Sequence, residues 1–143
     1  MTSTGLRRAL AALGLAAVLA YPTARAVRSL RMTRGGVATF AAIVGYANAG
    51  DLDAARSLCS RRYLGAHPLR PSPEGGMVGL PRRVHPNFRA WAEGDEVRLC
   101  PTDRVGPVYR LVFEGGAWKF DGLAGLLGPG GEVVPGAAVE DSP

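Results

Sequence analysis

The chain has 143 residues, of which 47% are hydrophobic, with 17 basic and 12 acidic side chains and a formal net charge of +5. This length fits one domain with a small hydrophobic core. Six basic residues and no acidic residue precede Val37, which leaves 11 basic against 12 acidic residues from Val37 to Pro143. A nearly neutral domain lacks the basic face that phosphate binding requires, so the composition argues against a nucleic-acid partner.

The N-terminal segment, residues 1–26, has the three parts of a signal peptide. Arg7 and Arg8 form a basic start, an uncharged Ala/Leu-rich stretch follows, and Ala24 and Ala26 are small residues at the spacing that signal peptidase prefers. The sequence therefore predicts export, which places the folded part in the periplasm or the cell envelope.

This segment has two alternative fates, cleavage and retention. The uncharged stretch from Ala9 to Ala24 has 16 residues, whereas a membrane-spanning helix needs about 20, which favours cleavage and a soluble product. Arginines on both sides of the stretch favour the alternative, a membrane anchor followed by a basic linker over residues 27–35.

Two helices are predicted at the start of the domain, which we expect to cover residues 36–127. Apolar residues recur at helical spacing from Gly36 to Ala49, and Gly50 is expected to end this helix. Asp51 is a suitable N-cap for a second, short helix. Residues 61–83 contain four prolines and four glycines, which predicts an irregular connection.

From Val84 onward the pattern changes to a period of two. Hydrophobic and polar residues alternate in four segments, at residues 88–91, 97–100, 109–114 and 118–121. Turn residues at 93–95 and 115–116 join neighbouring segments as antiparallel hairpins. The predicted fold class is α+β, with two N-terminal helices packed on a curved antiparallel four-stranded sheet and preceded by the signal or anchor helix. Residues 128–143 are predicted to be a disordered tail.

Three segments together carry a pattern known from other proteins. They are Val37-Ala38-Thr39-Phe40, then Ala49-Gly50-Asp51-Leu52-Asp53-Ala54-Ala55-Arg56, and the hairpin from Tyr109 to Phe120 that contains Trp118. Together they resemble the NTF2-like superfamily, also called cystatin-like or cone-shaped. The resemblance covers Gly36 to Gly122 and implies a helix packed on a bent sheet. It implies a fold rather than one activity, because this superfamily includes enzymes, binding modules and assembly domains.

The preferred functional hypothesis is a non-catalytic accessory domain that binds a protein or a small apolar ligand. The stretch from Arg61 to Arg89 is locally basic, and such a loop can dock anionic lipid headgroups or acidic envelope polymers. The alternative is a solvated loop whose arginines pair with nearby acids. The candidate ligand-binding residues lie on this loop and on the open sheet face, at Arg82, Arg83, Arg89, Trp91 and Trp118. A sheet that exposes Trp and Phe also favours a homodimer.

The second hypothesis is a small acid/base enzyme of the isomerase or dehydratase type, with His85, Asp103 and Tyr109 as the available groups. Two titratable groups with separated pKa values can move protons next to a carbonyl group. No catalytic motif matches residue by residue, however, and His85 before Pro86 also fits the surface start of a strand. A third hypothesis, a structural cell-envelope protein, predicts neither a pocket nor an exposed patch.

The two cysteines, Cys59 and Cys100, would enter a compartment that permits disulfides. A bridge between them would tie the second helix to the sheet and stabilise the fold by about 3 to 4 kcal/mol. Two separate, buried free thiols are the alternative. The cysteines and the histidines His67 and His85 lack the close spacing of a metal site, and no cofactor motif occurs, so we expect neither a metal nor a cofactor.

Overall fold

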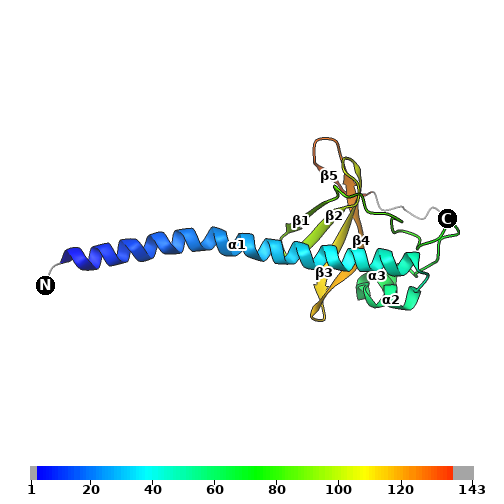
Figure 1. Ribbon diagram of the computed structural model, residues 1–143, viewed down its shortest axis with the longest axis horizontal. Helices are drawn as coiled ribbons and strands as arrows, with labels where there is room; N and C mark the ends of the chain where they lie inside the picture. Colours follow the sequence, from blue (N-terminus) through cyan, green and yellow to red (C-terminus); the bar gives the residue numbers. More distant parts are fainter. Residues whose placement is uncertain (1–2, 137–143) are drawn as a thin grey trace. The chain divides into compact units, whose positions relative to one another are not determined.

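A computed structural model of the chain describes residues 3–136, with side chains from residue 21 onward. These residues form two compact units that divide between Arg31 and Met32. Helix α1, Ser3–Asn48, contributes to both units, and all other helices and strands belong to the second (Figure 1).

The N-terminal unit consists of helix α1 up to Arg31, with Pro22 inside the helix. Residues 27–35, predicted as a linker, are helical as well. Within residues 3–136, no helix combines the length and the hydrophobicity that a membrane span requires. Met1 and Thr2, where the predicted targeting segment begins, lie outside the described residues. The targeting role of residues 1–26 stays a prediction.

Helix α1 ends at the glycine that the sequence indicates. Gly50 has a φ of 77°, and the N–H groups of Gly50 and Asp51 donate to the carbonyls of Ala47 and Tyr46, which is the hydrogen-bond pattern of a Schellman motif. Asp51 then caps helix α2, Leu52–Ser57, because its side chain accepts a hydrogen bond from the Ala54 N–H at 3.1 Å. Both predictions for this junction are confirmed.

The segment predicted as an irregular connection contains one further helix. Helix α3, Arg61–Ala66, begins after Ser60, whose hydroxyl accepts a hydrogen bond from the Tyr63 N–H. Beyond α3 the chain is mostly irregular, but it returns Met77 to the core with only 2% of its surface exposed. The prediction of an irregular segment is therefore wrong for its first six residues.

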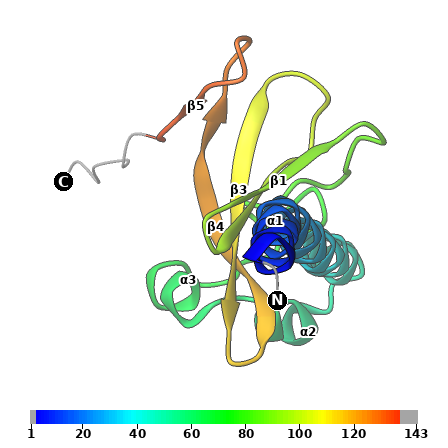
Figure 2. The same ribbon diagram turned by 90° about the vertical axis from the view of Figure 1, so that its left-hand side faces the viewer.

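The sheet is antiparallel, and its strands lie side by side in chain order. Figure 2 shows β3, β4 and β5 next to one another. The strands are β1 (Arg89–Glu93), β2 (Glu96–Cys100), β3 (Gly106–Glu114), β4 (Ala117–Leu127) and β5 (Val133–Val134). The first four correspond to the predicted strands, whereas β5 is a fifth strand in the segment predicted to be a disordered tail. It pairs with Leu126 and Leu127 at the end of β4. Residues 137–143 of that tail lie outside the described residues.

The part of α1 from Met32 onward covers one face of the sheet. Phe40 is 1% exposed, and its ring centroid lies 5.3 Å from that of Tyr109 and 6.2 Å from that of Phe120. Ile43 and Ala47 follow along the same side of the helix and are buried in the same cluster. The predicted α+β fold class is confirmed, because the apolar side of α1 and one face of the sheet form a single core.

Two glycines allow α1 to lie close to the sheet. A Cβ atom on Gly35 would be 2.4 Å from the indole of Trp118, and one on Gly36 would be 2.7 Å from Val97. Real Cβ atoms do not approach other atoms this closely, so larger residues would push the helix away from β2 and β4. The Gly35–Gly36 pair therefore sets the distance between the two layers.

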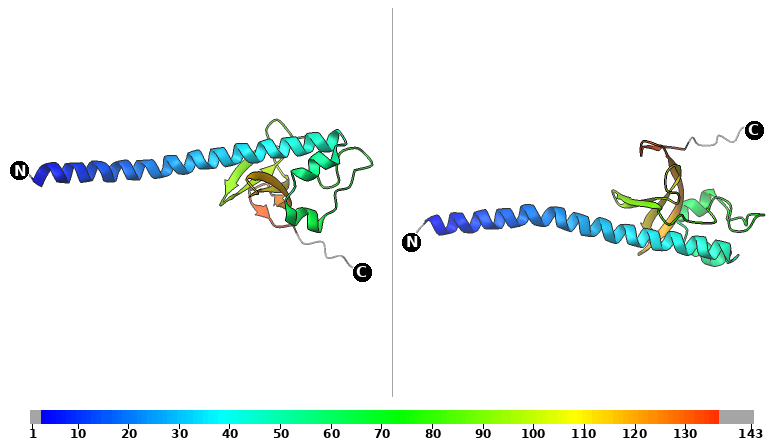
Figure 3. Two further views of the ribbon diagram at one scale, coloured as in Figure 1. Left: turned by 90° about the horizontal axis from the view of Figure 1, so that it is seen from below. Right: turned by 45° about the horizontal axis from the view of Figure 1, so that its top comes forward.

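The sheet curls along β3 and β4 (Figure 3). The pairing register of these strands shifts on both sides of Tyr109, and irregular pairing of this kind increases strand bending. Gly122, opposite the shift, has a φ of 96°, and a Cβ atom there would be 2.9 Å from the Tyr63 ring. The curl lets α3 pack against β4 and turns the sheet into a half-barrel.

Candidate functional site

A hollow of about 240 Å³ lies between α1 and the segment that leads into β1. Its lining is apolar except for one imidazole: Val37, Phe40, Ala41, Val84, His85, Pro86, Phe88 and Leu99. Val37 and Ala41 are four residues apart and therefore share one side of the helix. Because Ala41 is small, space remains there above the floor formed by Phe40.

The opposite wall of this hollow is held by backbone hydrogen bonds. The His85 N–H donates to the Pro101 carbonyl at 2.8 Å, and the Phe88 N–H donates to the His85 carbonyl at 3.0 Å. The first bond ties residues 84–88 to Pro101, which follows β2, and the second closes a turn within the segment. The wall is therefore tied to the sheet although it has no regular secondary structure.

A second hollow, of about 460 Å³, adjoins the first. It shares Val37 and Phe88 with the first hollow and adds Thr33, Arg34, Ala38 and Ala90. We call the two hollows together the α1 groove. The groove is apolar along its length, with Arg34 near one end and His85 near the other.

His85 and Asp103, two of the predicted catalytic candidates, lie beside each other at the groove. His85 Nε2 is 4.0 Å from Asp103 Oδ2, and the two side chains are 44% and 47% exposed. His85 Nδ1 accepts a hydrogen bond from the Asn87 N–H at 3.1 Å, so in the neutral imidazole the proton is on Nε2, toward Asp103. The pair of side chains could transfer a proton to a bound molecule, but both side chains are accessible to water.

Tyr109, the third candidate, lies elsewhere. It is 7% exposed and packs in the core between Phe40 and Phe120. Burial raises the pKa of its hydroxyl group. The structure therefore brings together two of the three predicted acid/base residues and assigns Tyr109 to core packing.

The predicted ligand-binding residues are divided among separate places. Arg82 and Arg83 line a polar hollow of about 600 Å³ with Asn48, Gly75 and Gly76, and the Asn48 side chain donates to the Arg82 carbonyl at 2.9 Å. This hollow lies at the end of α1. It is distinct from the α1 groove, because the two share no lining residue.

Arg89 and the two tryptophans do not join that hollow. Arg89 begins the edge strand β1 and is exposed. Trp118 packs on the α1 side of the sheet, whereas Trp91 packs on the opposite side beside Cys100 and Val108. The predicted set of five binding residues therefore does not form one site.

Both cysteines are buried free thiols, which corresponds to the second of the two alternatives for them. Cys59 belongs to the core under α1, and Cys100 belongs to a separate cluster on the other side of the sheet. Burial raises the pKa of the Cys59 thiol to about 11, so it is a poor nucleophile at neutral pH. Among the side chains described, no three His, Cys, Asp or Glu residues gather as a metal site would require.

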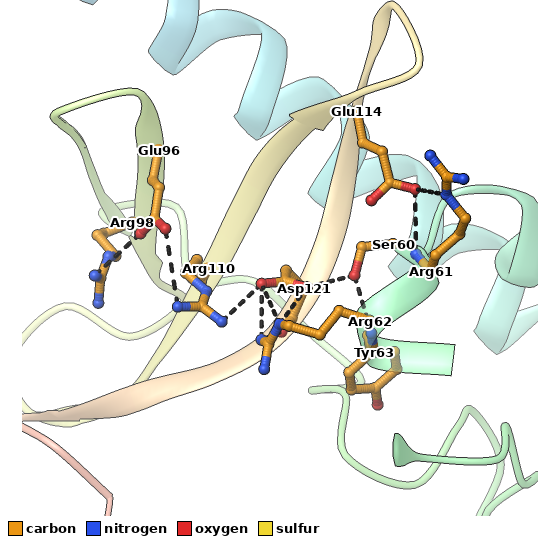
Figure 4. A network of polar contacts seen from close by, with 9 residues as sticks. All are labelled: Ser60, Arg61, Arg62, Tyr63, Glu96, Arg98, Arg110, Glu114 and Asp121. Atoms are coloured by element: carbon orange, nitrogen blue, oxygen red, sulfur yellow. Dashed lines mark hydrogen bonds and ion pairs between the residues drawn. The ribbon is translucent and has the colours of Figure 1, made fainter. Parts of the chain in front are cut away.

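A row of charged side chains crosses the sheet face away from α1 (Figure 4). Asp121 is at its centre and is 4% exposed. Arg110 Nη2 and Arg62 Nη2 each lie 2.7 Å from Asp121 Oδ2, and the Ser60 hydroxyl donates to Asp121 Oδ1. The row continues through Glu96, which pairs with both Arg110 and Arg98. Positive and negative charges therefore alternate from α3 across to β2.

The contacts within this row change the pKa of Asp121. Burial raises the pKa of Asp121, but hydrogen bonds from Arg62 and Ser60, together with the charges of Arg110 and Arg62, outweigh burial and lower it overall. Asp121 is therefore ionised and fully paired at neutral pH. We regard the row as structural, because its central carboxylate is inaccessible to a ligand.

The residues that form the α1 groove were missed as binding residues by sequence reasoning, which placed Val37, Phe40 and Ala41 in a helix stripe. No signal in the sequence distinguishes Ala41, because Ala47 on the same helix is equally small. Comparison of the chain with known protein families, with curated proteins and with solved structures found no match.

Proposed function

We propose that this protein is a non-catalytic accessory domain of the NTF2-like type that binds a small apolar ligand in the α1 groove. Export or membrane tethering by residues 1–26 would place this domain in the cell envelope. The observation that carries the proposal is the lining of the groove, in which apolar side chains from α1, from residues 84–88 and from β2 surround a hollow with one titratable group.

The size of the groove indicates the kind of ligand. Pockets for drug-sized ligands have volumes of roughly 300 to 1,000 Å³, and the hollow at His85 has about 240 Å³. It therefore suits a short alkyl chain, with the adjoining hollow available to the rest of the molecule. Arg34 and His85 at the two ends offer polar contacts to a head group, which favours a small amphiphile.

The NTF2-like assignment rests on the same elements as the sequence resemblance. A helix ending at Gly50 packs on a curled antiparallel sheet, and the β3–β4 hairpin carries Trp118. The proposed ligand site lies between this helix and the β1–β2 side of the sheet, because Ala90 and Leu99 line the groove opposite Val37. Ligand binding is inferred from the lining of the groove, and the NTF2-like resemblance agrees with it without being required.

Binding of octanol tests this function. We expect octanol to displace a hydrophobic fluorescent dye such as Nile red from the wild-type protein. Ala41→Leu should fill the hollow and weaken octanol binding at least about tenfold, a change of about 1.4 kcal/mol.

The matched control is Ala42→Leu, because Ala42 is the next residue of α1, is also exposed, and does not line the groove. It should bind octanol as the wild type does. Equal affinity of all three proteins, or no displacement from the wild type, would contradict the proposal.

A small acid/base enzyme is the second candidate, and the 4.0 Å approach of His85 and Asp103 at the groove favours it specifically. In this alternative, the Asp103 carboxylate removes a proton from a bound carbonyl compound while the Nε2–H group of neutral His85 donates a hydrogen bond to the carbonyl oxygen. An isomerase or dehydratase assay with short-chain carbonyl substrates would show activity that Asp103→Asn abolishes and His85→Gln reduces. Octanol binding without any such activity favours the accessory domain.

A further inference from the structure

The two edges of the sheet differ in how they are protected from pairing with other strands. Strand order leaves one side of β1 and one side of β5 without a neighbouring strand in the described sheet. Strand β5 has two residues and is followed by Pro135, which are common ways to block an edge. Strand β1 has five residues and contains no proline, lysine or bulge.

The backbone groups at the open side of β1 can be assigned from its hairpin. Gly94 and Asp95 form a two-residue turn, so Glu93 and Glu96 are the hydrogen-bonded pair that closes it. Hydrogen-bonded and non-hydrogen-bonded pairs alternate along an antiparallel ladder. The N–H and C=O groups of Ala90 and Ala92 are therefore directed away from β2, toward the open edge.

The sequence of β1 is complementary to itself. It reads Arg89-Ala90-Trp91-Ala92-Glu93, with a basic residue and an acidic residue at equal distances from the central tryptophan. When two such strands pair antiparallel about Trp91, each Arg89 lies opposite the partner subunit's Glu93. In the same register Ala90 lies opposite the partner subunit's Ala92. The outward N–H and C=O groups of these two residues then form hydrogen bonds with each other.

The charges at both ends of β1 are available for this pairing. Arg89 is exposed and makes no ion pair with another described residue. The Glu93 side chain is 57% exposed, and its Oε2 atom has only long contacts, 3.4 Å to Trp91 Nε1 and 3.8 Å to Arg98 Nε. The hollow beside Ala90 also leaves space on the α1 side of the edge.

We propose that β1 is a homodimerisation edge, through which two copies of the chain pair antiparallel about a two-fold axis at Trp91 and form a continuous ten-stranded sheet. The two indoles meet on the sheet face away from α1, and the charge pairs between Arg89 and the partner subunit's Glu93 fix the register. A single strand pair is a small interface, so the dimer dissociates on dilution. The proposal does not rest on ligand binding in the α1 groove, although Ala90 of β1 also lines that groove.

Sedimentation velocity of the full chain over a wide concentration range tests the dimer. We expect the wild type to shift from monomer to dimer as its concentration rises. Arg89→Glu and Glu93→Arg each place like charges opposite one another at both ends of the pairing, and each should weaken the dimer at least about tenfold. The double variant reverses every charge pair and should restore the wild-type dissociation constant.

A second measurement does not depend on charge. In an antiparallel pair without hydrogen bonds the Cα atoms are about 4.5 Å apart, which is within the range for a disulfide. Oxidation of Trp91→Cys should therefore give a covalent dimer, whereas Val105→Cys, in an exposed loop, should not. Far-ultraviolet circular dichroism confirms that each variant is folded.

Three results would overturn the proposal. The first is a wild type that stays monomeric, as expected if β1 instead recruits a strand from a different protein. The second is a dimer that the single charge variants leave unchanged. The third is a double variant that fails to recover dimerisation.

Discussion

On the sheet face toward α1, Phe40, Tyr109 and Phe120 pack ring against ring, whereas the opposite face carries a row of charges centred on Asp121. The first face is held by burial of apolar surface, which depends little on direction. The second depends on hydrogen bonds whose donors must meet Asp121 at the correct angle and distance. The apolar face therefore tolerates a gap, the α1 groove. The charged row fixes the position of Asp121, although Arg98 Nε and Arg110 Nε within it are buried without a hydrogen-bond partner.

The largest effect in this comparison is expected at the centre of the apolar face. Phe40→Ala removes a ring that is 1% exposed and should lower the free energy of unfolding by about 3 to 5 kcal/mol. Phe113→Ala is the control, because Phe113 is 60% exposed on the same sheet and its loss should cost less than about 1 kcal/mol. Urea denaturation measures both. Similar losses would show that Phe40 is not part of a packed core.

A smaller effect is expected from the charged row. Asp121→Asn leaves Arg110 and Arg62 without their carboxylate, and we expect a loss of about 2 to 3 kcal/mol. This loss of free energy of unfolding is smaller than that for breaking a fully buried ion pair, because the side chains of Arg62 and Arg110 are partly exposed to solvent.

The same substitution should change the pH dependence of unfolding. Because the folded-state pKa of Asp121 is lowered, its contribution is present above the unfolded-state pKa of about 4 and is lost as the pH falls through the folded value. Wild-type stability should therefore decline on acidification more steeply than that of Asp121→Asn. Parallel pH profiles would contradict the paired, ionised state of Asp121.

The smallest effect is expected where α1 meets the sheet. Gly36→Ala places a Cβ 2.7 Å from Val97 and should cost about 1 to 3 kcal/mol through displacement of the helix. Gly45→Ala, in the same helix with open space around it, should instead gain about 0.5 to 1 kcal/mol. Thermal unfolding compares the two. The same sign for both variants would mean that close contact at Gly36 does not set the layer spacing.

The sequence predicted those features that depend on neighbouring residues. The end of α1 at Gly50 and the N-cap at Asp51 follow from local hydrogen bonds, and the first four strands follow from their period of two. Helix α3 was missed because six residues carry too little periodicity, although Ser60 provides an N-cap. Strand β5 was missed because two residues form a strand only through their pairing with the end of β4.

The candidate site was predicted less completely, since it depends on contacts between distant residues. His85 and Asp103 were both named from their chemistry, but their proximity depends on the hydrogen bond from His85 to Pro101. The charged row requires the shifted register of β3 and β4, which places Arg110 beside Asp121. The groove is a gap between two layers, and a gap leaves no pattern in a sequence.

Methyl NMR during a titration with octanol shows whether a small apolar ligand binds in the α1 groove. We expect saturable shifts for methyl groups of Val37, Val84 and Leu99, which line the groove. Methyl groups of Val108 and Leu127, in the cluster on the opposite face, should not shift. Shifts confined to Val108 and Leu127, or no saturable shift at any of these residues, would contradict binding in the α1 groove.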